Sequence, residues 1–301
     1  MVGVQDTPIA SAVAAAFDAK QQVQAQRLPR PDEPRVLAVS NQKGGVGKTT
    51  TTVNIAAALA WQGLRVLVID LDPQGNASTA LGVDHHVGTP STYEVLLGGL
   101  SVADVAVECA EHPGLWCVPA TIDLAGAEIE LISMVSRESR LKRALVAYLN
   151  GPDPADYILI DCPPSLGQLT INALVAAREV LIPIQCEYYA LEGLGQLQRI
   201  IALVQADLNP ALHISSILLT MYNARTRLAD QVAGEVRTHF PELVFDTIIP
   251  RSVRLSEAPS YGQTVLAYDP SSRGAQAYVE AAKELALRAK TDGPAEERER
   301  G

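Results

Sequence analysis

The sequence has few aromatic residues and few cysteines. Aromatic residues make up 5% of the 301 residues and hydrophobic residues 48%, so the core must be built mainly from Ala, Val, Leu and Ile. Such a core suits helices packed on a parallel sheet better than an aromatic-rich β-sandwich. The four cysteines are Cys109, Cys117, Cys162 and Cys186. None has CxxC spacing, so we expect small core residues rather than a zinc or iron–sulfur site.

The sequence also lacks a long apolar run and an excess of positive charge. No segment reaches the roughly 18 apolar residues that cross a bilayer, and the N-terminus has no basic region followed by an apolar run. We therefore expect a soluble, cytoplasmic protein with no membrane partner. The formal net charge of −10 disfavours broad attraction to nucleic acid, but it is compatible with a local basic patch.

The chain divides into three parts. Residues 1–34 contain an Ala- and Gln-rich stretch, Ala10 to Gln26, that is compatible with a helix, followed by Pro29, Pro31 and Pro34. We interpret these residues as a flexible N-terminal arm and linker. Residues 35–290 alternate apolar β-type runs with helical patterns, and residues 291–301 form a polar C-terminal tail.

The alternation in residues 35–290 predicts an α/β fold. The expected strands are Val36–Ser40, Arg65–Asp70, Leu115–Pro119, Tyr157–Asp161, Glu179–Pro183, Ile214–Thr220 and Val244–Ile249. The expected helices are Lys48–Trp61, Ala127–Leu149, Leu169–Ala177, Leu191–Leu208, Leu228–Phe240 and Gly274–Lys290. Apolar strands that alternate with helices form a mostly parallel, twisted sheet with helices on both faces and right-handed crossovers.

The strongest motif lies between the first strand and the first helix of this domain. The string NQKGGVGKTT, from Asn41 to Thr50, matches the phosphate-loop pattern GxxxxGK[ST] except that Gln42 replaces the first glycine. The glycines let backbone N–H groups turn toward phosphate oxygens, and the helix N-terminus adds its positive end. We expect Lys48 to reach the β- and γ-phosphates of ATP, and Thr49 to ligate Mg²⁺. The predicted nucleotide-binding loop comprises Lys43, Gly44, Gly45, Val46, Gly47, Lys48, Thr49 and Thr50.

Carboxylates follow two of the expected strands. Strand ends in open α/β sheets face the ligand crevice, so Asp70, Asp72 and Asp161 should lie near the phosphate loop. Asp72 is the better candidate to orient the attacking water, and Asp70 would support the loop or the metal shell. The string PQGN after Asp72 is also a good turn, which Asp70 could cap. Asp161 ends the apolar run YILID, a Walker B arrangement, and the predicted metal site is Thr49, Asp72 and Asp161.

A second lysine in the loop, Lys43, carries further information. The string KGGVGKTT resembles the deviant Walker A motif, KGGxGK[ST], of the ParA/MinD group of P-loop ATPases. The resemblance extends from about Val36 to Lys290. The strings PIQCEYYALEG, TMYN and IPRSVRLSEAP are similar to those of the chromosomal ParA (Soj) proteins.

This resemblance implies a function and a set of site residues. It implies a Mg²⁺-dependent ATPase in which Lys43 reaches across a face-to-face homodimer to the partner's nucleotide. The predicted catalytic residues are then Lys43, Lys48 and Asp72. The resemblance also implies non-specific DNA binding at the nucleoid and a ParB-type centromere-binding partner. It places Asn223 and Pro250 beside the adenine.

Five arginines lie close together in the sequence, at Arg225, Arg227, Arg237, Arg251 and Arg254. Arginine suits phosphate contacts, although scattered surface arginines are usually only solvated. The resemblance to chromosomal ParA proteins singles out Arg225 and Arg254 as DNA-binding residues.

Other members of the superfamily fit less well. A MinD-type division-site ATPase needs a basic amphipathic C-terminal helix, whereas this chain ends in DGPAEERERG. A nitrogenase-type iron protein needs paired cluster cysteines, a tyrosine-kinase relative needs a Tyr-rich tail, and plasmid-type ParA needs a longer N-terminal domain. A metabolic P-loop enzyme remains the alternative, and ATP-dependent binding to non-specific DNA would separate the two.

Overall fold

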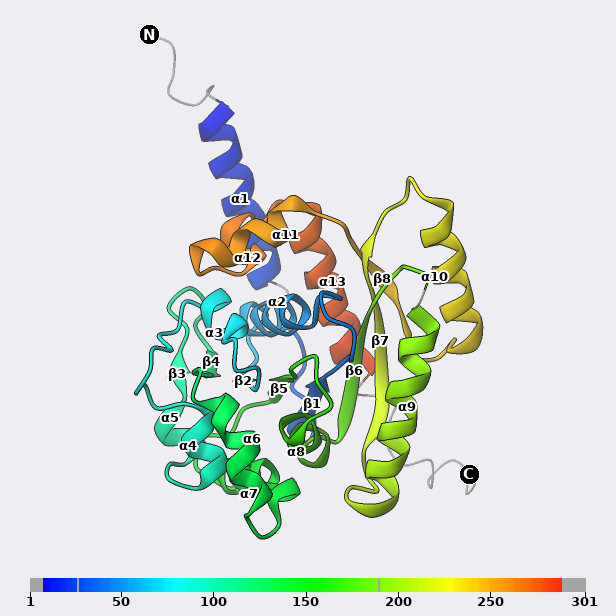
Figure 1. Cartoon of the computed structure of the whole chain (residues 1–301). Coiled ribbons are helices and arrows are strands. Elements are labelled where there is room, and N and C mark those ends of the chain that lie inside the picture. The colour runs from blue at the N-terminus through cyan, green and yellow to red at the C-terminus, as the bar shows by residue number, and fades with distance from the viewer. Residues whose placement is uncertain (1–7, 26, 189, 289–301) are drawn as a thin grey trace, which may run out of the picture.

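A twisted sheet forms the centre of the molecule (Figure 1). The computed structural model describes residues 8–25, 27–188 and 190–288. Within these residues, eight strands form one sheet in the order β3-β4-β2-β5-β1-β6-β7-β8. The strands are β1 (Arg35–Val39), β2 (Val66–Asp70), β3 (Val107–Glu108), β4 (Leu115–Val118), β5 (Tyr157–Asp161), β6 (Glu179–Gln185), β7 (His213–Tyr222) and β8 (Val244–Pro250). All neighbours are parallel except β3 and β4.

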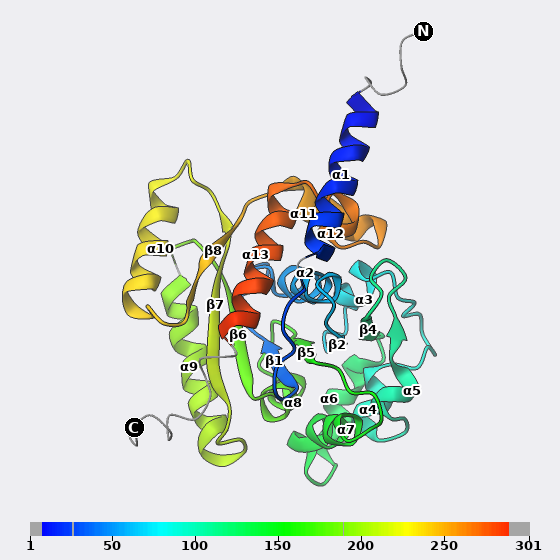
Figure 2. The ribbon, with the colours of Figure 1, turned by 180° about the vertical axis from the view of Figure 1, so that it is seen from behind.

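Helices cover both faces of the sheet (Figures 1 and 2). One face packs on α2 (Lys48–Trp61), α3 (Asn76–Ala80), α12 (Val265–Tyr268) and α13 (Arg273–Arg288). The other packs on α4 (Thr92–Leu97), α5 (Val102–Val105), α6 (Leu124–Ile132), α7 (Arg140–Leu149), α8 (Gln168–Ala176), α9 (Ala190–Asp207) and α10 (Arg227–His239). Strands β1, β2 and β5 are buried throughout, as expected for strands covered on both sides. The predicted fold class is confirmed.

The sequence predicted most elements, but one predicted helix is wrong. All seven expected strands are present to within two residues, and the four cysteines are buried as expected. The predicted helix Ala127–Leu149 is instead divided into α6, a short 3₁₀ turn and α7. Helix α6 ends at Ile132, and Ser136, in a left-handed conformation with φ of 53°, separates it from the helical turns that follow. Asn172 of α8 then accepts from the backbone N–H of Leu141 and donates to the carbonyl of Arg137, so that α7 begins on a tertiary contact.

The N-terminal arm contains the helix that its composition suggested, α1 (Pro8–Ala25), which projects from the body (Figures 1 and 2). Its last turns lie against the C-terminal end of α2. Lys20 Nζ is 5.0 Å from the ring centroid of Trp61, and the N–H of Leu28 donates to the carbonyl of Gln62 at 3.1 Å. A cation is favoured there because a helix C-terminus carries a partial negative charge. The three-part division of the chain stays a prediction, and residues 291–301 lie outside the described part.

A buried ion pair ties the base of β1 to its neighbour β6. Arg35 and Glu179 are each 8% exposed at the side chain, and the guanidinium binds both carboxylate oxygens at 2.7 and 2.6 Å. Arg35 also donates to the carbonyl of Leu285 in α13 at 2.7 Å. Arg35 and Glu179 therefore join β1, β6 and α13 at the end of the sheet opposite to the carboxyl ends of the strands.

None of the helices in residues 8–25, 27–188 and 190–288 combines the length and apolar character that a membrane crossing requires.

Candidate functional site

The phosphate loop lies between β1 and α2, at the edge where the parallel strands end. Gly45 and Gly47 have φ values of +74° and +88°, a region that glycine enters without steric cost. Val46 between them is buried, and its carbonyl accepts a hydrogen bond from Thr220 Oγ1 of β7 at 2.8 Å. The loop is therefore shaped by its glycines and fastened to β7.

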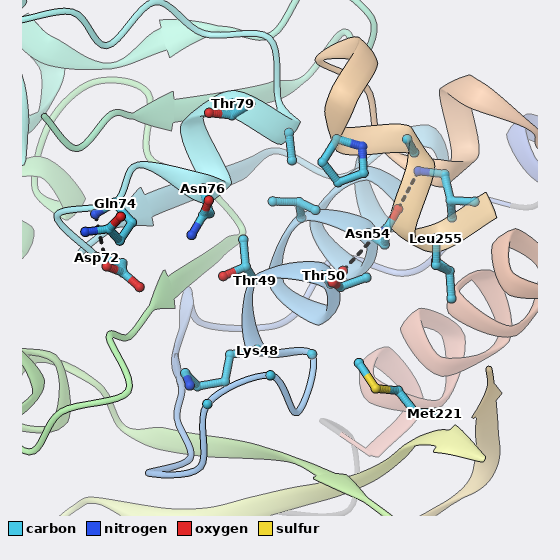
Figure 3. A pocket seen from close by; sticks show the side chains of 18 of the residues that line it. Lys48, Thr49, Thr50, Asn54, Asp72, Gln74, Asn76, Thr79, Met221 and Leu255 are labelled. Carbon is cyan, nitrogen blue, oxygen red and sulfur yellow. Dashed lines mark hydrogen bonds between the residues drawn. The ribbon is translucent and has the colours of Figure 1, made fainter. Parts of the chain in front are cut away.

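A cavity of about 480 Å³ opens beside this loop (Figure 3). Six of the eight predicted loop residues line it: Gly44, Gly45, Gly47, Lys48, Thr49 and Thr50. Asp72 lies on the β2 side of the cavity, and Lys48 and Thr49 lie on the α2 side. The far wall is apolar and includes Met221, Leu255, Ala258, Pro259 and Val265. A polar end and an apolar end fit the phosphates and the base of a nucleotide.

Lys48 is a buried cation within the loop. The residue is 7% exposed, and Nζ donates to the carbonyl of Lys43 at 3.3 Å. Burial lowers the pKa of Lys48, although Asp161, Cys162 and Asp72 act in the opposite direction. A desolvated ammonium group in a glycine-rich loop is suited to an incoming polyphosphate.

Asp161 and Thr49 form the candidate magnesium site. Thr49 Oγ1 donates to Asp161 Oδ2 at 2.7 Å, and Thr52 Oγ1 donates to Oδ1 at 3.1 Å. Asp161 is fully buried, and burial together with the nearby charge of Asp70 raises its pKa to about 8. A hydroxyl and a carboxylate are the oxygen donors that Mg²⁺ prefers, so these residues fit the ion.

Asp70 and Asp72 have different roles. Asp70 is paired in register with Asp161 and accepts from the N–H and the hydroxyl of Ser78 at 2.8 and 2.7 Å. Burial raises the pKa of Asp70 to about 6 despite these bonds. Asp72 is less buried, at 9% exposed, and caps the following turn by accepting from the N–H of Gln74 at 3.0 Å. Asp70 therefore supports the site from behind, while Asp72 lies at the cavity wall.

Lys43 points away from the cavity. Its Nζ lies 2.6 Å from Glu187 Oε2 in the connection between β6 and α9, and Lys43 is not among the lining residues. The two lysines of the loop thus occupy different environments. The predicted action of Lys43 on a partner's nucleotide stays a prediction.

The two residues predicted to contact adenine, Asn223 and Pro250, are absent from the described wall of the cavity, and their role stays a prediction. Asn223 Oδ1 accepts from the N–H of Arg225 at 3.1 Å, and Pro250 is paired in register with Tyr222. Neither Asn223 nor Pro250 is among the described residues that line the cavity. The string IPRSVRLSEAP does reach the wall, through Leu255 and Pro259.

The arginines of the predicted group lie in different surroundings. Arg225 is exposed in the loop after β7. Arg254 lies on α11 (Val253–Glu257), 54% exposed, with Glu257 at 3.2 Å and Asp269 at 3.4 Å. Arg237 donates to the carbonyls of Phe245 and Asp246, so its guanidinium is used within the fold.

Comparisons with known proteins agree with this geometry. A family model described as an AAA domain matches residues 34–214. The sporulation initiation inhibitor protein Soj of Bacillus subtilis (strain 168) is 54% identical over 252 residues, which cover 84% of this chain and 98% of Soj. The chromosome partitioning protein ParA of Caulobacter vibrioides (strain NA1000 / CB15N) is 53% identical over 254 residues, which cover 84% of this chain and 94% of ParA. The chain belongs to the ParA/Soj family of chromosome-partitioning ATPases.

Solved structures of other nucleotide-binding proteins have the same fold as this ParA/Soj chain. Cobyrinic acid a,c-diamide synthase from Mycobacterium smegmatis, with bound ATP analogue and magnesium, is 44% identical with a TM-score of 0.73 and covers 87% of this chain and 97% of its own. The septum site-determining protein MinD from Pyrococcus horikoshii OT3, complexed with Mg-ADP, is 25% identical with a TM-score of 0.67 and covers 84% of this chain and 96% of its own. The family relationship and the fold therefore agree.

Several residues around the site of this ParA/Soj chain are absent from the sequence prediction. Thr52 holds Asp161, Thr220 holds the phosphate loop, and Glu187 holds Lys43. The strings PIQCEYYALEG and TMYN contain Glu187 and Thr220, but a string does not say which of its side chains turn toward the loop. Thr52 lies two residues beyond the string NQKGGVGKTT. Met221, with φ of 50°, is a further lining residue, and the string TMYN contains it although no role was predicted for it.

Proposed function

We propose that this chain is an ATP-dependent molecular switch for DNA segregation. The observation that carries the proposal is the pair of loop lysines, with Lys48 in the cavity wall and Lys43 outside it, in a chain 54% identical to Soj over 98% of Soj's length. Lys48 would bind the nucleotide of its own subunit. Lys43 would contact the nucleotide of a second copy, so that ATP joins two subunits face to face.

The same cavity provides for slow hydrolysis. Thr49 and Asp161 would hold Mg²⁺, which would neutralise the charge that develops on the phosphates. Asp72, with a carboxylate at the cavity wall, would orient the attacking water. Hydrolysis would separate the two copies, and a ParB-type centromere-binding protein would accelerate it.

Asp72→Ala should separate hydrolysis from dimerisation. The phosphate loop stays intact, but the water loses its orienting group, and a misplaced reactant of this kind slows a reaction by about 100-fold. The variant should accumulate as an ATP-bound dimer in light scattering with ATP and Mg²⁺. An Asp72→Ala protein that hydrolyses ATP at the wild-type rate, or stays monomeric with ATP, would contradict this assignment.

DNA binding would be ATP-dependent, local and independent of base sequence. Two or three arginines bind weakly, but a dimer doubles the patch and tethers it, which raises affinity by avidity. The proposal therefore explains how an acidic chain could hold DNA in only one nucleotide state. It also implies a location on the nucleoid in the cytoplasm.

Arg225→Ala and Arg254→Ala should each weaken DNA binding at every sequence tested. Each lost phosphate contact should lower the slope of log affinity against log salt by about 1. The matched control is Arg178→Ala, which removes a charge 66% exposed beside Glu33 at the amino end of β6. Gel shifts with ATP across a salt series are the measurement. Unchanged binding in the Arg225→Ala/Arg254→Ala double variant would place the DNA surface elsewhere.

A metabolic function is the alternative, because a relative of 44% identity carries the name of an amide synthase. An amide synthase has a second substrate beside ATP, and ATP turnover would then require that substrate. ATP-dependent retention on non-specific DNA in a wild-type gel shift supports the partition switch, whereas its absence supports the metabolic alternative.

A further inference from the structure

Lys43 is held by a carboxylate of its own chain. Lys43 Nζ lies 2.6 Å from Glu187 Oε2, with the two side chains 37% and 47% exposed. The backbone around Lys43 is fixed as well, because its N–H donates to Asn41 Oδ1 at 3.1 Å and Asn41 Nδ2 donates to the carbonyl of Pro183 at 2.8 Å. The first half of the phosphate loop is therefore docked on the end of β6.

Glu187 is itself oriented toward Lys43. Its other oxygen, Oε1, accepts a hydrogen bond from Gln185 Nε2, and its backbone N–H donates to the carbonyl of Gln185 at 2.8 Å. Both oxygens of the carboxylate are thus engaged, one by the amide and one by the lysine. Because an acceptor fixed in this way does not have to be ordered on contact, Glu187 binds the lysine at little entropic cost.

We propose that Glu187 is a positioning residue that retains Lys43 on its own subunit until the nucleotide of a second copy replaces it. The inference rests on the proposed function, in which Lys43 acts across the dimer. In this proposal the ammonium group leaves its 2.6 Å contact with Glu187 when it turns to the phosphate of another subunit. Opening the Lys43–Glu187 pair is then a required step of dimerisation, and its strength sets the protein concentration at which dimers form.

The exposure of the pair fixes the size of the effect. Ion pairs exposed to this degree change an equilibrium by a factor of about 1.4 to 5. A symmetric dimer opens two such pairs, so the two factors multiply. Removing the pair should therefore lower the dissociation constant of the nucleotide-bound dimer by about 2- to 30-fold.

The test is Glu187→Gln in the full-length chain, which keeps the shape of the side chain and removes its charge. Sedimentation across a protein concentration series, with Mg²⁺ and a non-hydrolysable ATP analogue, gives the dimer dissociation constant. Titration with a fluorescent ATP analogue at a protein concentration below that constant gives the nucleotide affinity of the monomer. The matched control is Glu33→Gln, which removes one charge from the exposed Glu33–Arg178 pair at the other end of β6.

Glu187→Gln should dimerise about 2- to 30-fold more tightly than wild type, with unchanged monomer affinity, while Glu33→Gln behaves as wild type. The Lys43→Ala/Glu187→Gln double variant should match Lys43→Ala, because the effect acts only through the lysine. An unchanged or weaker dimer in Glu187→Gln, beside a wild type that dimerises, overturns this inference and leaves the proposed function intact. A wild type that stays monomeric with the analogue overturns both.

Discussion

Lys48→Ala is expected to weaken ATP binding by roughly 30-fold to several thousandfold, the range for removing one partner of a buried charged contact. The large effect follows from burial. Lys48 is 7% exposed and lines the cavity beside the loop glycines, so little water would screen its attraction to the β- and γ-phosphates. Titration with a fluorescent ATP analogue in the presence of Mg²⁺ measures the loss.

The same loop offers the matched control for this measurement. Lys43→Ala removes an identical charge five residues earlier, but from a side chain that points to Glu187 and not into the cavity. Its monomer should bind ATP within a few-fold of wild type. The Lys48→Ala protein should also stay folded, because burial lowers the pKa of this lysine and its charge is therefore a cost to the fold. Equal ATP affinity in the two variants would contradict the assignment of Lys48.

Glu179→Ala is expected to destabilise the fold by about 3–5 kcal/mol, the typical cost of leaving a buried charge without its partner. Arg35 would keep its charge, since its pKa lies above the ordinary value for arginine even though burial opposes this. Urea unfolding followed by circular dichroism measures the change. The Arg35→Met/Glu179→Leu double variant should be close to wild type, because well-packed apolar residues often replace a buried pair without loss.

The pH dependence of stability gives a second readout of the same pair. Burial alone would raise the pKa of Glu179, but the hydrogen bond and charge of Arg35 outweigh it and hold the pKa below its ordinary value of 4.5. The stability that the carboxylate provides is therefore fully present above about pH 4.5, and it is lost as the pH falls through the lowered pKa. Glu179→Ala should lose this part of the acid sensitivity. A Glu179→Ala protein with wild-type stability at pH 7 would show that the Arg35–Glu179 pair does not stabilise the fold.

Local sequence patterns predicted the strands and the phosphate loop because their cause is local. An apolar run such as YILID forms a strand that is buried on both faces of the sheet. The string GGVGKTT supplies the backbone freedom and the positive charge that phosphate binding requires. The break between α6 and α7 was missed because its cause is tertiary. Asn172, some 30 residues further on, supplies the bonds on which α7 begins.

Within the candidate site, the sequence identified the residue types but not their directions. Lys48 was assigned to the nucleotide of its own subunit and Lys43 to that of a partner, but no string indicated that Lys43 pairs with Glu187 at the end of β6. For the same reason Arg237 was grouped with the other arginines, although its guanidinium donates to carbonyls of β8. The direction of a long side chain depends on acceptors that are distant in sequence.

The hydrogen bond from Thr220 to the phosphate loop has a consequence for the distance over which the proposed switch must act. Thr220 is near the end of β7, and Arg225 is the fifth residue after it on the same backbone. Five residues span at most about 18 Å when fully extended. The loop that holds phosphate and the arginine proposed to hold DNA are therefore joined by one short covalent tether. A displacement of the phosphate loop would therefore reach Arg225 directly through the end of β7. It would not have to pass through the rest of the domain.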